Sequence, residues 1–146
     1  MGKIFIAWKK PAYRHFRVDR MYPVLLVGIG GSIGAMMRYG VGQMLPRSSY
    51  AFPWATFAVN VIGSYLLGLV LFGSMQKQIM GQDALTMFSV GLLGAFTTMS
   101  TFSYESLALF DKQQYGLVAL HIIGTVLLTL MAVYAGKITA NHLWKL

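Results

Sequence analysis

The sequence predicts an all-α membrane protein with four transmembrane helices, the third broken within the membrane. The 146 residues are 56% hydrophobic and 11% charged, with a mean hydropathy of +0.59, whereas soluble domains carry about 25% charged residues. Four apolar segments, at residues 22–45, 54–75, 84–110 and 115–136, each exceed the roughly 20 residues that span a bilayer. Hydroxyl side chains interrupt the third segment, and this interruption predicts the break.

The composition gives little support to an enzyme. The chain contains no cysteine, and its carboxylates are Asp19, Asp83, Glu105 and Asp111. No two of these carboxylates are spaced as an acid–base pair, and the histidines show no metal-binding spacing. We therefore expect no catalytic residues.

Residues 1–20 are interpreted as a basic N-terminal tail, and residues 21–146 as the four-helix domain. Six of the twelve basic side chains lie in the tail. This charge is typical of a segment held near anionic lipid, and no nucleic-acid-binding fold accompanies it. The apolar run that follows is too long for the hydrophobic region of a signal peptide. Both Met1 and Met21 are candidate start sites.

The first apolar segment, residues 22–45, contains no Asp or Glu. Small multidrug-resistance antiporters depend on an acidic residue in their first span, which argues against that alternative. Gly30 and Gly34 form a small-xxx-small pair that allows helices to approach closely. Arg38 is an intramembrane charge, and such residues are functional candidates near aqueous entrances. It could draw anions into a vestibule.

The second segment, residues 54–75, is uncharged but carries a small polar stripe. Asn60, Ser64 and Gly68 follow one another at four-residue spacing and so share a helix face. One interpretation of Asn60 is an interhelical hydrogen bond, worth roughly 0.6 kcal/mol on average. The other is an amide that donates its N–H groups to an anion that has shed water.

The third segment, residues 84–110, contains the run GLLGAFTTMSTFSYE at 91–105. Its hydroxyl side chains belong to Thr97, Thr98, Ser100, Thr101 and Ser103. Hydroxyls at this density favour a helix break, where freed backbone groups must find partners inside protein or water. Broken helices at membrane depth usually line an ion or substrate site. Phe96 and Phe102 flank the run, and their ring edges carry a partial positive charge that could solvate an anion. We expect Glu105 to hold the break through hydrogen bonds.

The fourth segment, residues 115–136, carries a second polar stripe at His121, Thr125 and Thr129. A buried histidine is more often a satisfied core residue than a ligand, but two hydroxyls continue its face. Neutral donors of this kind can bind an anion and also release it, as a channel requires.

The basic residues outside the tail are nearly balanced between the two membrane sides. Lys77, Lys137 and Lys145 lie on one side, against Arg47 and Lys112 on the other, with Arg38 as a third candidate there. This balance fixes no orientation and permits insertion both ways round. With the tail included, the count becomes nine against three, which favours one orientation.

Three motifs together resemble the Fluc/CrcB family of fluoride channels. They are GGSIGAMMRYG at 30–40, PWATFAVNVIGSYLLG at 53–68 and GLLGAFTTMSTFSYE at 91–105. The resemblance implies a dual-topology antiparallel homodimer in the lipid bilayer with two fluoride pores, or a heterodimer with a paralogue. It also implies a structural sodium ion, Na+, at the interface, held by the backbone carbonyls of Gly94 and Thr97.

The resemblance also implies roles along the anion path. The family's pore asparagine falls on Asn60, its vestibule arginine on Arg38, and its pore phenylalanines on Met99 and Phe102. The remaining candidates on the path are Ser100, Thr101, His121, Thr125 and Thr129.

Met99 is the main departure from the family motif, because a thioether has no positive ring edge. Ala95 in place of a usual glycine and His121 where tyrosine or asparagine is common are milder changes.

We therefore expect a passive fluoride channel of a prokaryotic inner membrane that lowers cytoplasmic fluoride. The alternatives are a non-transporting membrane assembly subunit, which would leave the hydroxyl-rich break unexplained, and the antiporter considered above.

Overall fold

The computed structural model describes residues 21–45 and 52–144, and all regular elements among them are helices. Four helical stretches are long and apolar enough to cross a membrane, namely Met21–Met44, Trp54–Lys77, Gln82–Asp111 and Tyr115–Leu143. The predicted fold class is thereby confirmed. The basic tail 1–20, Arg47 and Lys145 lie outside the described residues.

Three of the four spans are single helices, and the third is divided. The single helices are α1 (Met21–Met44), α2 (Trp54–Lys77) and α6 (Tyr115–Leu143). The third span consists of α3 (Gln82–Thr86), the π-helical stretch η2 (Met87–Leu93), α4 (Gly94–Phe96) and α5 (Met99–Asp111).

The break predicted from the hydroxyl run lies between α4 and α5. Thr97 has ψ 157°, and Thr98 has φ −148° and ψ 121°, so both residues are extended. The Thr98 side chain accepts a hydrogen bond from the Thr101 backbone N–H at 3.2 Å. Thr98 is therefore the N-cap that starts α5, a position at which threonine is favoured.

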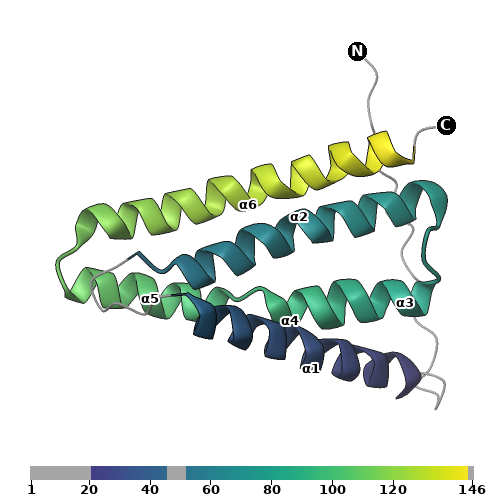
Figure 1. The fold of residues 1–146 in the computed structure, drawn as a ribbon, viewed down its shortest axis with the longest axis horizontal. Helices are drawn as coiled ribbons and strands as arrows, with labels where there is room; N and C mark the ends of the chain where they lie inside the picture. The colour runs from purple at the N-terminus through teal and green to yellow at the C-terminus, as the bar shows by residue number, and fades with distance from the viewer. Residues whose placement is uncertain (1–20, 46–51, 145–146) are drawn as a thin grey trace, which may run out of the picture.

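The helices form two neighbouring pairs (Figure 1). The α2 helix packs along α6, and α1 packs along η2 and α4, while α5 also contacts α6. The predicted close approach at Gly34 occurs within the protomer, because a Cβ there would overlap the Leu92 carbonyl oxygen. In the pair formed by α2 and α6, a Cβ on Gly136 would overlap the Tyr65 carbonyl oxygen. Backbone-to-backbone contact of this kind needs glycine.

The last helix continues beyond the apolar segment that predicted it. The apolar pattern ends near residue 136, whereas α6 continues to Leu143. The polar end of α6 is hydrogen-bonded to α2, since the Tyr65 hydroxyl donates to Thr139 at 3.2 Å and the Gln76 amide donates to Asn141. The hydropathy pattern marks where the apolar part of the helix ends. The helix itself continues because hydrogen bonds to α2 stabilise its polar turns.

Candidate functional site

The helix break is held by the side chain of Asn60, which comes from α2. The Thr98 backbone N–H donates to Asn60 Oδ1 at 2.8 Å, and Asn60 Nδ2 donates to the Thr98 carbonyl at 3.0 Å. Asn60 is 8% exposed. A carboxamide suits this position because it offers a donor and an acceptor side by side, so it satisfies both backbone groups of one residue in the break.

These side-chain bonds take N–H donors away from two backbone carbonyls at the break. In a continuous helix the Thr98 N–H would bond to the carbonyl of Gly94, and the Thr101 N–H to that of Thr97. Here the Thr98 N–H donates to Asn60 and the Thr101 N–H to the Thr98 hydroxyl. The Gly94 and Thr97 carbonyl oxygens therefore lose their helical donors to side chains.

Arg38 lies at the same level on α1. Its Nε donates to the carbonyl of Ala95 at 3.0 Å, which links α1 to the end of α4. The side chain is partly buried and also lines a cavity. Arg38 therefore supports the broken helix while it supplies a positive charge to that cavity.

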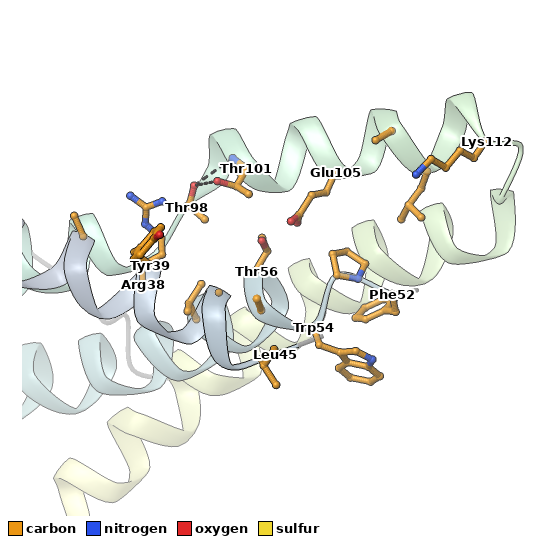
Figure 2. Close-up of a pocket in the computed structure, with 17 residues that line it drawn as sticks. Arg38, Tyr39, Leu45, Phe52, Trp54, Thr56, Thr98, Thr101, Glu105 and Lys112 are labelled. Atoms are coloured by element: carbon orange, nitrogen blue, oxygen red, sulfur yellow. Dashed lines mark hydrogen bonds between the residues drawn. The ribbon is translucent and has the colours of Figure 1, made fainter. Parts of the chain in front are cut away.

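The cavity has a volume of about 660 Å³ and lies between α1, α2 and α5. Its polar lining residues are Arg38, Tyr39, Thr56, Thr98, Thr101, Glu105 and Lys112. Figure 2 shows Arg38 and Lys112 at opposite ends, with the Glu105 carboxylate pointing toward Thr56 between them. At a rise of 1.5 Å per residue, the α5 wall from Thr98 to Lys112 is about 20 Å long. The cavity thus connects the break with the far end of α5.

Glu105 lies in the second turn of α5 and faces His121 of α6. Glu105 Oε2 is 3.9 Å from His121 Nε2, and the side chain of His121 is fully buried. The imidazole also contacts two rings, with centroid separations of 4.9 Å to Phe102 and 5.4 Å to Phe52. His121, Phe102 and Glu105 are therefore one cluster beside the cavity.

The rest of the fourth-span stripe follows His121 along α6. Thr125 is buried, and its hydroxyl has no hydrogen-bond partner within the described ranges 21–45 and 52–144. The Thr129 hydroxyl donates back to the Thr125 carbonyl at 2.7 Å. His121 and Thr125 thus present unsatisfied polar atoms inside the protomer, and Thr129 is occupied by its own helix.

Three of the predicted site residues face outward from the protomer. Met99 is 71% exposed, and Ser100 and Gly94 are also exposed. Phe102, by contrast, is 6% exposed. The structure therefore brings Arg38, Thr101 and Glu105 together around the cavity and Phe102 with His121, but leaves Met99, Ser100 and Gly94 on an outer surface.

The cavity also contains residues that the sequence did not single out. Thr56, Tyr39 and Lys112 all line it. A signal existed for Thr56, because it precedes Asn60 by four residues and extends the same helix face. Tyr39 and Lys112 carry no such signal, since their inclusion depends on how α1 and α5 are placed in space.

A family model described as "CrcB-like protein, Camphor Resistance (CrcB)" matches residues 25–137. The chain is also 44% identical over 123 residues to "Fluoride-specific ion channel FluC 1" of Methanosarcina acetivorans, an alignment that covers 84% of this chain and 94% of the relative. It is 42% identical over 113 residues to "Fluoride-specific ion channel FluC" of Thermus thermophilus, covering 77% and 90%. Identity to the protein of that name from Geobacter sulfurreducens is 36% over 124 residues, covering 84% and 100%.

Proposed function

The chain belongs to the CrcB family of fluoride-specific ion channels, and from this membership we propose how its residues carry the ion. It is a multi-pass membrane protein that acts as a passive fluoride channel, and it is not an enzyme. Its proposed role is to lower cytoplasmic fluoride across the inner membrane. HF, a weak acid, enters by diffusion and dissociates inside, and the anion leaves through the channel.

The mechanism rests on the break between α4 and α5, where the Asn60 side chain is hydrogen-bonded to the Thr98 backbone. Dehydrating fluoride is costly, so a path through the membrane must replace its water with many short hydrogen bonds. Asn60 Nδ2 carries two hydrogens, of which one is donated to Thr98 and the second can be donated to an anion. The break also places α5 with its N-terminus, the positive end of the helix dipole, at membrane depth.

Further donors extend the proposed path on both sides of Asn60. Thr101 lies in the wall of the cavity that leads to the break. Beyond it, Phe102 presents its ring beside His121. The polar atoms of His121 and Thr125 are buried and able to bond to an ion. Ser100, Met99 and Thr129 complete the proposed set. The groups in this set are neutral, and the charges lie in the cavity at Arg38, Glu105 and Lys112, so the anion is bound weakly enough to leave.

We place the path at the contact of two protomers in an antiparallel dimer, with one pore for each protomer. An ion path cannot face lipid, yet Met99 is 71% exposed on the single protomer and Ser100 is exposed beside it. A second copy of the chain would cover these residues and enclose the ion. A paralogue inserted the opposite way would do the same.

A sodium ion at the Gly94 and Thr97 carbonyls of both protomers is part of this proposal. Carbonyl oxygens are hard ligands of the kind that alkali and alkaline-earth cations bind. Both carbonyls have lost their helical donors, and Gly94 is exposed where a partner would meet it. A bound sodium ion would supply a fixed positive charge that joins the two broken helices.

A substitution of Thr97 distinguishes sodium binding by its backbone carbonyl from sodium binding by its side-chain hydroxyl. This hydroxyl donates to the Leu93 carbonyl at 3.1 Å, which turns the side chain toward its own helix, and the proposed ligand is the backbone oxygen. We expect Thr97→Ala to keep the sodium dependence of fluoride flux. Loss of that dependence in a folded Thr97→Ala protein would show that the side chain is the ligand.

The channel function is tested by anion efflux from liposomes that contain only this purified chain. Fast release of fluoride without release of chloride is the expected result. Absence of fluoride release from a correctly folded protein would contradict conduction by this chain alone and would indicate a partner subunit or an assembly role.

A further inference from the structure

His121, which the proposed anion path includes, has one feature that conduction does not use, namely a carboxylate next to its ring. The side chain is fully buried, and neither ring nitrogen has a hydrogen-bond partner within residues 21–45 and 52–144. A buried polar group left unsatisfied costs about 1–3 kcal/mol. A proton on the ring would place a charge where burial disfavours one, so a proton site here depends on a carboxylate next to the ring.

Glu105 lies between this imidazole and the cavity. Its Oε2 atom is 3.9 Å from His121 Nε2, and its side chain is 28% exposed while that of His121 is fully enclosed. The carboxylate also lines the 660 Å³ cavity. A proton from water in the cavity can therefore reach the imidazole by way of the carboxylate, although the imidazole itself touches no solvent.

The charges around the pair come from two elements, α1 and the end of α5. The α1 helix contributes Arg38 and Tyr39 to the cavity, and the end of α5 contributes Lys112. On the imidazole side, the neighbouring rings are those of Phe102 from α5 and Phe52 from the stretch before α2.

Within residues 21–45 and 52–144, no charged residue of another element is found next to the imidazole. The α2 helix carries one charged residue, Lys77, at its far end. On α6 itself, the ionisable residues closest in sequence are Tyr115 and Tyr134, each more than one turn away. In the part of the chain that the structure describes, Glu105 is thus the charged group that faces His121.

We propose that His121 and Glu105 form a proton-binding site in the wall of the cavity, and that its occupancy sets the charge an entering anion meets. With the imidazole neutral, the described charged residues of the cavity wall, Arg38, Lys112 and Glu105, together carry a formal charge of +1. A proton on the pair raises this to +2 and offsets the carboxylate that repels an anion. The step is a reversible transfer of one proton from hydronium in the cavity, which forms one N–H or O–H bond on the pair and leaves a water molecule.

We predict that fluoride conduction is faster at lower pH. Clefts lined by one sign of charge raise the arrival rate of oppositely charged ions by roughly 10- to 1,000-fold. A single added charge belongs at the low end of that range. We expect fluoride flux to rise by roughly tenfold from about pH 8 to about pH 5, the interval in which histidines change charge.

The proton site is tested first without any flux measurement. In the full-length protein with isotope-labelled histidine, reconstituted in nanodiscs, the His121 NMR signal should shift as the pH falls from about 8 to 5. His121→Gln assigns the signal by removing it. Glu105→Gln should displace the midpoint of the His121 titration. A His121 signal that does not move over this range, or a midpoint unaffected by Glu105→Gln, overturns the proposal.

The consequence for flux, which rests on the proposed function, is tested in liposomes. Flux is measured across the same pH interval, after subtraction of HF leakage in protein-free vesicles. His121→Gln should flatten the pH dependence. His142→Gln is the matched control, because it makes the same change at the exposed end of the same helix and should keep the wild-type profile. Equal pH profiles for wild type and His121→Gln would refute the coupling.

If the NMR titration occurs but no fluoride flux is seen at any pH, the channel function fails while the proton site stands.

Discussion

At the scale of single residues, Asn60 has one role that the structure shows and a second that we propose, and the sequence presented the two as alternatives. Its amide makes both hydrogen bonds to the Thr98 backbone, which is the interhelical role. The second hydrogen on Nδ2 remains available for the anion role. Because one side chain serves both, changes at Asn60 should affect the shape of the break and conduction together.

The variant Asn60→Asp separates hydrogen-bond donation from side-chain shape. A carboxylate keeps the acceptor for the Thr98 N–H but loses the donor to the Thr98 carbonyl and adds a charge that repels fluoride. We expect fluoride efflux to fall to the level of protein-free liposomes. Asn141→Asp, at the polar end of α6 away from the cavity, should keep wild-type efflux. Normal flux in Asn60→Asp would remove this residue from the pathway.

A second residue-scale prediction concerns Met99. A thioether is polarisable but lacks the positive edge of a phenyl ring, so Met99→Phe should raise fluoride flux. The side chain is 71% exposed on the protomer, and a partner subunit would bring it to the anion. Met75→Phe is the control, since Met75 is 74% exposed near the end of α2. Equal efflux for Met99→Phe and wild type would show that this position does not contact the ion.

At the scale of elements, the break depends on the helices that hold it from both sides. From α2, Asn60 bonds to Thr98, and from α1, Arg38 bonds to Ala95. The α1 helix can lie this close because Gly30 and Gly34 present bare backbone to η2 and α4. Helix packing at these glycines thus keeps Arg38 within reach of the break.

The variant Gly34→Ala tests this packing. Its Cβ would overlap the Leu92 carbonyl oxygen, and overpacking of this kind typically costs about 1–3 kcal/mol. We expect a lower temperature of thermal unfolding in detergent. Gly28→Ala is the matched control on the same helix, because no atom lies within 4 Å of its Cβ and alanine is the better helix former. Equal destabilisation by both variants would contradict the packing argument.

At the scale of the whole molecule, one protomer leaves much of its apolar surface uncovered. The most hydropathic windows of the α1 and α6 spans are each only 11% buried. Lipid can cover apolar side chains, but the hydroxyls and carbonyls exposed at the break need protein or water. The proposed antiparallel dimer meets this need by placing the break of one protomer against its partner.

The orientation of the protomers is open to a direct test. The chain contains no cysteine, so a single Gly81→Cys substitution in the loop between α2 and α3 reports which side that loop faces. For protein translated from Met21, we expect a membrane-impermeant thiol reagent to label about half of the molecules from each side. Translation from Met1 adds six basic residues and should bias labelling towards one side. Uniform one-sided labelling of the Met21 form would contradict dual insertion.

The sequence by itself determined the four spans, the break at the hydroxyl run and the family, because hydropathy, backbone competition by threonine and motif spacing are properties of neighbouring residues. It also marked Asn60, Arg38 and His121 as polar groups in apolar segments. Tertiary structure decided what they touch: Asn60 bonds to Thr98, and His121 faces Glu105 at 3.9 Å across two helices. It also brought Lys112 to the cavity. Contacts between distant segments depend on how helices pack in three dimensions, and a pattern along one helix does not say which residues of another helix it meets.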